Sequence, residues 1–230
     1  MISFPELPNT ELFEPVSTFR LVTIRADPFK SIAGDTGKLL IIEHLERLTE
    51  RSDMHEQTYD ILPELGMEIV NTAFTRSTDG YNRFNDDKRG AWYCALAHDT
   101  AVKEVAYNQK RNGEHTGDSG SEVILREIFA DFTGTFRSAK GLPRGEGILG
   151  ANRKKTYKYT QPFANKIRDE GARGIIYPSV RDPKGFCLVA FHREIVRNVR
   201  LGDRWKMSWN ENGKLIMDKI EEDMSFLRNL

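Results

Sequence analysis

Short runs of apolar and β-branched residues, separated by turns that contain glycine or proline, recur along this chain and predict strands. Residues 17–24 (STFRLVTI) and 90–97 (GAWYCALA) are two such runs. Residues 174–191 predict a pair of strands, GIIYPSV and FCLVAF, around the turn RDPKG. Residues 205–217 predict a hairpin with an Asn-Gly tip. The apolar segment 122–136 fits a strand and a helix equally well.

Helical spacing appears early in the chain, at residues 38–51 and, interrupted by a proline, at residues 56–74. Their Leu and Ile stripes indicate core packing or a partner interface. These helices separate the first predicted strand from the rest of the chain, so we interpret about 35–70 as an insertion. We expect a single domain over residues 1–230, with a hairpin or helix at about 203–230.

Later helices are predicted at residues 100–111, where Asp99 is a candidate N-cap, and between Pro162 and Gly171. Residues 108–122 are polar and glycine-rich and predict a loop. The mixed order of strands and helices predicts an α+β fold, with mixed, largely antiparallel sheets and flanking helices.

The charges of this chain balance, because 34 Lys and Arg face 34 Asp and Glu. No global field therefore favours nucleic acid or an anionic membrane. The two cysteines, Cys94 and Cys187, lie in apolar runs and indicate buried thiols in a reducing compartment. The first residues lack a secretory signal pattern and no 18 apolar residues run together, so we expect a cytoplasmic protein without a membrane span.

Several common active-site patterns are missing from the sequence. The five histidines show no pair at metal-ligand spacing, so we expect no metal site. Residues 118–122 (DSGSE) supply no nucleophile elbow, and residues 34–38 (GDTGK) are too short for a phosphate-binding Walker loop. A metalloenzyme and a serine hydrolase are therefore disfavoured.

Residues 145–150 read GEGILG, the spacing of a dinucleotide-binding loop. That loop needs a strand before it, a helix after it and an acidic residue about 20 positions on. Here no apolar run precedes the pattern and no helical stripe follows it, and Glu170 lies in a charged segment. We interpret a glycine loop, and a dinucleotide ligand would be held by other residues.

Candidate chemistry gathers between residues 76 and 104. Arg83 stands in a polar turn before a strand, where a guanidinium can bind a phosphate with two hydrogen bonds. Tyr93 follows ten residues later in that strand, and Glu104 eleven residues further, at the edge of a helical apolar stripe. The alternative interpretation is a surface arginine and a solvated glutamate.

Two further polar residues lie on predicted strands. Ser179 follows Pro178 at a strand end, where the rigid neighbour can orient its hydroxyl. Arg20 stands inside the apolar strand FRL, and arginine is seldom buried without a partner. A strand-edge guanidinium in water is the alternative for Arg20.

Together these elements resemble the RES domain, named for its Arg, Glu and Ser, which is the toxin half of many bacterial toxin–antitoxin pairs. The intervals of ten and eleven residues match that family, and the resemblance covers roughly 17–24 and 76–192. Arg20 and Arg83 are 63 positions apart, further than in many members. The resemblance rests on the segments FRL, RF, GAWYCALA, TAVKE and YPS, which carry Arg20, Arg83, Tyr93, Glu104 and Ser179.

The resemblance implies a fold similar to ADP-ribosyltransferase toxins and an enzyme that consumes NAD+ as its substrate, without a cofactor. Members break the nicotinamide–ribose bond with water, phosphate or, in some cases, a protein acceptor. It also implies an antitoxin partner with an Xre-like helix-turn-helix domain, and we expect the chain to form a homodimer or a toxin–antitoxin hetero-oligomer. Direct nucleic acid binding by this chain and membrane contact are not expected.

The same resemblance implies roles for the matched residues. The transition state carries positive charge on the ribose, which Glu104 would stabilise while holding a ribose hydroxyl. Tyr93 would stack on nicotinamide, and Ser179 would orient the nicotinamide amide or the ribose. Arg83, together with Arg20, would bind the pyrophosphate.

Two alternative functions stay open from the sequence. A mono-ADP-ribosyltransferase for a protein target is one, although arginine-directed members carry an acid two residues before the glutamate, where Val102 stands here. A non-catalytic binding module is the other, because residues 153–159 (RKKTYKY) interleave basic and aromatic side chains as single-strand binders do. Because the segment is only seven residues in a neutral chain, a solvated loop is the favoured explanation for it.

Overall fold

The structure, a computed structural model, describes residues 5–23, 59–60, 63–75, 82–116 and 122–220. The helix predicted at 38–51, the GDTGK segment and the last ten residues lie outside this described part. Two compact units make up the chain. Unit 1 takes residues 1–20, 63–104 and 129–199, and unit 2 takes residues 21–62, 105–128 and 200–230.

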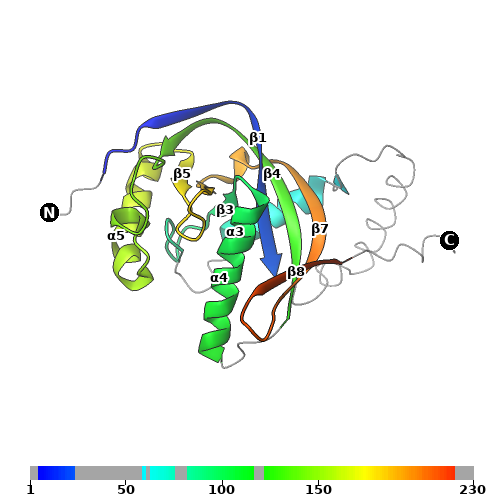
Figure 1. Ribbon diagram of the computed structural model, residues 1–230. Helices are drawn as coiled ribbons and strands as arrows, with labels where there is room; N and C mark the ends of the chain where they lie inside the picture. The colour runs from blue at the N-terminus through cyan, green and yellow to red at the C-terminus, as the bar shows by residue number, and fades with distance from the viewer. Residues whose placement is uncertain (1–4, 24–58, 61–62, 76–81, 117–121, 221–230) are drawn as a thin grey trace. The chain divides into compact units, whose positions relative to one another are not determined.

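Unit 1 is built on a mixed sheet (Figure 1). Its neighbouring strands are, in order, β1 (Asn9–Thr23), β3 (Trp92–Ala95), β6 (Phe186–Ala190), β5 (Gly174–Pro178) and β4 (Val123–Ser138), of which β1 and β4 extend into unit 2. β1 also pairs with β4, so the first and last of these five strands are paired with each other. The pairs β1–β3, β3–β6 and β5–β6 are antiparallel, and β4–β5 is parallel. The predicted α+β class is confirmed.

The central strands β5 and β6 form the core of this unit because both of their faces are covered. Ile175, Ile176, Leu188 and Val189 are completely buried. Burying a side chain of this size stabilises the fold by about 1.5–3 kcal/mol. These strands therefore give a rigid base to the loop between them, residues 179–185, which matches the predicted turn.

From its sequence, segment 122–136 could be a strand or a helix, and in the structure it is part of strand β4. The buried side chains Ile128, Ala130, Phe132 and Phe136 are an even number of residues apart, as one face of a strand requires. Thr18 Oγ1 of β1 donates to the Ala130 carbonyl at 2.8 Å, which ties the two strands together.

Helix α4 spans His98–Thr116 and differs at both ends from its prediction. It begins at His98, so Asp99 lies in the first turn instead of preceding the helix as an N-cap. A carboxylate there still interacts favourably with the positive end of the helix dipole. The helix also continues through Gly113 into residues predicted as loop, at a cost of about 1 kcal/mol for that glycine.

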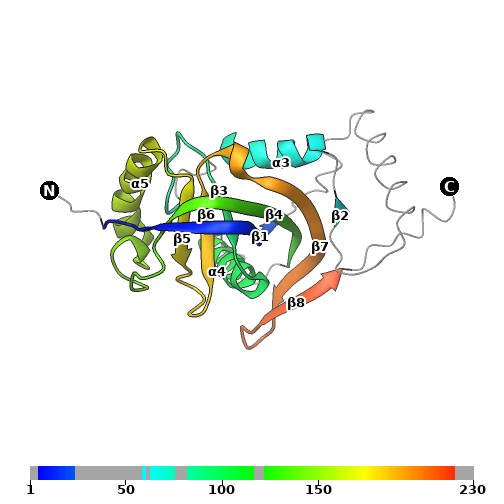
Figure 2. The same ribbon diagram turned by 90° about the horizontal axis from the view of Figure 1, so that it is seen from above.

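Helix α5 spans Arg153–Asp169, and it begins nine residues before the predicted start at Pro162, which lies inside it. The Asn152 side chain accepts the Lys155 N–H at 3.1 Å and caps the helix. Gly171 adopts φ +89° just beyond the helix, as predicted from its freedom to take a left-handed conformation. Figures 1 and 2 show α5 beside β5.

Helix α3 spans Pro63–Thr75, so among the described residues the second early helix begins at its proline. Residues Tyr59–Asp60 form the short strand β2 where a helix was predicted. Proline is well suited to a first helical position because its missing N–H is not needed there.

Unit 2 contains the predicted C-terminal hairpin. β7 (Arg197–Trp209), whose first residues belong to unit 1, and β8 (Leu215–Ile220) pair antiparallel around a tip at 210–214. β2 pairs with β7 at Tyr59 opposite Leu201. Across the described residues, no helix is long and apolar enough to cross a membrane.

Candidate active site

Glu104 and Ser179 are 75 residues apart in sequence and are directly hydrogen-bonded. Ser179 Oγ donates to Glu104 Oε1 at 2.6 Å and accepts the N–H groups of Arg181 and Asp182 at 3.0 and 2.9 Å. The hydroxyl is completely buried, and its one donor and two acceptor positions are all in use. Ser179 therefore holds the partly buried glutamate in one orientation, and Glu104 is not a freely solvated side chain.

Arg83 connects its own turn, residues 82–85 (the RF turn), to the glycine loop at 145–150. Its Nη1 donates to the carbonyls of Ile148 and Gly150 at 2.8 and 3.1 Å, and the side chain is 9% exposed. Its guanidinium carbon also lies 5.6 Å above the Tyr157 ring. Nε and Nη2 have no hydrogen-bond partner within the described residues. Arg83 is therefore a buried residue and not the surface arginine of the alternative interpretation.

The glycine loop contains a short 3-10 helix at Gly147–Leu149, and α5 starts three residues after Gly150. The expectation that no helix follows the GEGILG pattern is therefore wrong. No strand leads into it, since β4 ends at Ser138. Two of its carbonyl oxygens accept hydrogen bonds from a cation, whereas a dinucleotide-binding loop directs N–H groups at phosphate. The interpretation as a glycine loop is consistent with this geometry.

Tyr93 is attached to the same RF turn through its hydroxyl. The hydroxyl accepts the Phe84 N–H at 2.9 Å and donates to Asn85 Oδ1 at 2.9 Å. Burial raises the pKa of Tyr93 far above its ordinary value, so the phenol stays protonated. Both hydrogen bonds orient the ring and occupy the hydroxyl.

Arg20 lies next to Tyr93 in spite of its distance in sequence. Its Nη1 donates to the Tyr93 carbonyl at 3.0 Å, and its guanidinium carbon lies 4.7 Å above the Trp92 ring. Burial lowers the pKa of Arg20, while the neighbouring Cys94 and Tyr93 raise it. The strand-edge alternative, in which Arg20 points into water, does not fit these contacts.

Tyr177 packs against the turn that carries Arg83. Burial raises the pKa of Tyr177 well above its ordinary value; Cys187, Glu104 and Tyr93 raise it further, and Arg83 lowers it. The Tyr177 ring also packs edge-on against Phe84, with the ring centroids 5.0 Å apart. Sequence reasoning missed Tyr177, although a tyrosine within the aliphatic run GIIYPSV is a signal.

Metal-binding residues do not gather in this region. Within the described residues, no three His, Cys, Asp or Glu side chains are arranged to hold a metal ion. The candidate residues are two arginines, which can bind an anion, and a glutamate held by a serine, which can accept a hydrogen bond.

Comparisons with known proteins place this chain in a family. No curated protein matches it. A chain in the crystal structure of the M. tuberculosis MbcT–MbcA toxin–antitoxin complex is similar, with 12% sequence identity, 86% of this chain and 87% of that chain covered, and a TM-score of 0.46. The family model of the RES domain matches residues 59–210, which include Arg83, Tyr93, Glu104 and Ser179. Because this match covers more than half of the 230 residues, the chain belongs to the RES domain family.

Proposed function

We propose that this chain is the toxin of a toxin–antitoxin pair and that it degrades NAD+ by breaking the bond between nicotinamide and ribose. The observation that carries the proposal is the 2.6 Å hydrogen bond by which Ser179 orients the Glu104 carboxylate. Membership of the RES domain family supports the toxin role.

The reaction needs a carboxylate beside the ribose. When the bond from C1′ to the nicotinamide nitrogen breaks, its electrons neutralise the pyridinium and leave positive charge on the sugar. Water then adds to C1′ and releases a proton, which gives ADP-ribose. Phosphate in place of water gives ADP-ribose phosphorylated at that carbon.

Glu104 has one oxygen available for this task. Ser179 occupies Oε1, while Oε2 accepts no hydrogen bond from any residue that the structure describes. Oε2 would hold a ribose hydroxyl and stabilise the developing charge. A positioned acid or base contributes about 10²–10⁴ in rate, so Glu104→Gln should lower turnover by at least the lower bound.

The arginines would hold the pyrophosphate. Arg83 uses Nη1 for the glycine loop, which leaves Nε and Nη2 for phosphate oxygens. Arg20 would add a second charge through the part of its guanidinium that does not bind the Tyr93 carbonyl. The Tyr93 hydroxyl is occupied, so its ring would contact nicotinamide by stacking.

Water or phosphate is a better acceptor for this site than a protein arginine. The position two residues before Glu104 holds Val102, which is buried in α4 and supplies no second acid. The protein would act in the cytoplasm, where an antitoxin with an Xre-like helix-turn-helix domain would bind and neutralise it.

The proposal is tested by measuring cellular NAD+ after brief induction of the wild type, of Glu104→Gln and of a control variant, Glu170→Gln. Glu170 is an exposed acid whose carboxylate lies 3.9 Å from Lys166. We expect NAD+ to collapse and nicotinamide to appear with the wild type and the control only. ADP-ribose or its phosphorylated form, identified by mass spectrometry, names the acceptor. NAD+ that stays level in all three strains contradicts the proposal.

A further inference from the structure

A carboxylate outside the residues assigned above ties the Ser179 loop to helix α4. We infer that Asp182 is a positioning residue, which sets the geometry of the Ser179–Glu104 pair through this tie. The kinetic part of this inference rests on the proposed function, whereas the structural part does not.

The loop at 179–185 is closed by its own backbone. The Ser179 N–H donates to the Gly185 carbonyl at 2.9 Å, and the Gly185 N–H donates to the Asp182 carbonyl at 3.1 Å. The Asp182 N–H donates to Ser179 Oγ at 2.9 Å. A displacement of Asp182 therefore displaces one of the two N–H groups that orient the serine hydroxyl.

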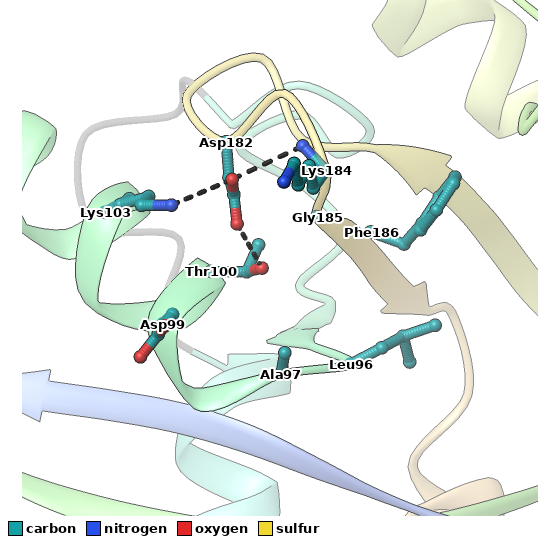
Figure 3. Close-up of a pocket in the computed structure, with 9 residues that line it drawn as sticks. All are labelled: Leu96, Ala97, Asp99, Thr100, Lys103, Asp182, Lys184, Gly185 and Phe186. Carbon is teal, nitrogen blue, oxygen red and sulfur yellow. Dashed lines mark hydrogen bonds and ion pairs between the residues drawn. The ribbon is translucent and has the colours of Figure 1, made fainter.

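The side chain of Asp182 binds the helix that carries Glu104 (Figure 3). Thr100 Oγ1 donates to Oδ2 at 2.7 Å, and Lys103 Nζ donates to Oδ1 at 2.9 Å. Thr100 is four residues before Glu104 and Lys103 one residue before it, so both lie within about one helical turn of the glutamate. Asp182 is 6% exposed, and these bonds lower the pKa of its carboxyl.

The loop and the helix approach each other so closely that Gly185 has no space for a side chain. A Cβ atom at this position would come within 2.2 Å of Thr100 Oγ1 and 2.6 Å of Asp182 Oδ2. Real Cβ atoms essentially never come this close to another atom, so the hydrogen bond between Thr100 and Asp182 requires glycine at position 185. Thr100, Asp182 and Gly185 therefore pack as one unit.

Arg144 holds the same loop by its backbone. Its Nε donates to the Ser179 carbonyl at 3.0 Å and its Nη2 donates to the Gly185 carbonyl at 3.3 Å. The loop is thus bonded to Arg144 at both ends and to α4 in its middle. Asp182 binds Thr100 and Lys103 of the helix that carries Glu104, in addition to the bond from Ser179 to Glu104 itself.

An open pocket of about 380 Å³ provides a matched control, because Asp99 and Asp182 both line it (Figure 3). Asp99 has an 89% exposed side chain, and its carboxylate lies 3.8 Å from the imidazole of His98. Asp99→Asn therefore removes the same charge from the same pocket without touching the loop. Any effect of Asp182→Asn that Asp99→Asn lacks is caused by the loss of the Asp182 bonds to Thr100 and Lys103.

The expected effect of Asp182→Asn is on the chemical step. The amide group loses the charge that holds Lys103, so the serine and glutamate shift relative to each other. A misplacement of about 1 Å can cost roughly 100-fold in rate, so we expect kcat for NAD+ to fall about 10- to 100-fold with little change in KM. Lys103→Met removes the same ion pair from its half-exposed partner and should act in the same direction.

A double-mutant cycle separates positioning from general damage. In a Ser179→Ala background the hydroxyl is absent, so Asp182→Asn should lower kcat little further. Equal kcat in wild type and Asp182→Asn overturns the inference. A loss that appears in KM alone, or one that adds in full to the Ser179→Ala loss, overturns it as well.

Amide hydrogen exchange tests the tie without substrate. We expect faster exchange in peptides covering 179–185 and the first turns of α4 in Asp182→Asn and Lys103→Met, and wild-type exchange in the 179–185 peptides in Asp99→Asn. Unchanged exchange in the two tie variants overturns the inference. A wild type that does not cleave NAD+ contradicts the proposed function instead, and the exchange result then decides the role of Asp182 alone.

Discussion

Arg83 Nη1 and the Ile148 carbonyl oxygen are joined by a 2.8 Å hydrogen bond, so the arginine proposed to bind phosphate also holds the glycine loop. The same nitrogen reaches the Gly150 carbonyl at 3.1 Å. A planar guanidinium can bind a carbonyl on one side and a phosphate on another, because its five N–H groups diverge in one plane. The residue would thus combine its structural role with the ligand-binding role proposed for it.

Arg83→Lys tests whether these two roles need the guanidinium group or only its positive charge. Lysine keeps the positive charge but has no fork with which to bind the loop and the pyrophosphate together. Each charge-assisted hydrogen bond lost costs about 1.5–3 kcal/mol. We expect KM for NAD+ to rise roughly 10- to 150-fold, measured by steady-state kinetics.

The control for this experiment is Arg89→Lys, at an exposed arginine that pairs with Asp169 at 2.6 Å. It should leave KM at the wild-type value. An Arg83→Lys enzyme with unchanged NAD+ affinity and turnover would remove Arg83 from the binding site.

Tyr93→Phe should lower the free energy of unfolding. The substitution removes the hydroxyl that pairs with the Phe84 N–H and Asn85 Oδ1, and it leaves both groups without that partner. An unsatisfied buried polar group costs about 1–3 kcal/mol. Urea unfolding followed by circular dichroism measures the loss.

Tyr159→Phe is the matched substitution at a tyrosine that is 46% exposed on α5. It should stay within about 0.5 kcal/mol of wild type, as surface substitutions usually do. Equal stabilities for the two variants would mean that the Tyr93 hydroxyl bonds contribute nothing.

The strands could be predicted from this sequence better than the helix boundaries. Apolar runs identify β3, β5 and β6 because these short strands are buried along nearly their whole length and are therefore apolar at almost every position. The start of α5 was missed because its buried face includes Thr156 and Thr160, which do not read as an apolar stripe. Helix caps such as Asn152 are single residues whose signal is easily overlooked.

Contacts between distant segments account for what the sequence could not show. The spacing of Arg83, Tyr93 and Glu104 pointed to one site, but no pattern indicated that the Tyr177 ring packs against Phe84. The turn RDPKG was identified as a turn, whereas the bonds from its Asp182 to α4 depend on how the helix packs. Segment 122–136 likewise becomes a strand through its pairing with β1 and β5.

Asn152→Ala should destabilise the protein by about 1 kcal/mol, because the Lys155 N–H loses the oxygen that caps α5. Asn152→Asp keeps a capping oxygen and should restore the wild-type free energy of unfolding. Thermal and urea unfolding measure both variants. A loss of equal size in Asn152→Asp would show that the cap is not the cause.

The stability that Asp182 contributes should depend on pH in a defined direction. Hydrogen bonds from Lys103 and Thr100 lower the pKa of its carboxyl in the folded state below the ordinary value of 3.8. A carboxyl with a depressed folded pKa stabilises the protein fully above its unfolded pKa, and this contribution is lost as the pH falls through the folded value. Wild type should therefore exceed Asp182→Asn in melting temperature by a constant margin from pH 7 to about pH 5, and the margin should shrink below about pH 4. Melting curves of both proteins across this range measure the margin, with Asp99→Asn as the exposed control. A margin that grows on acidification would reverse the sign and contradict an ionised Asp182 bound to Lys103.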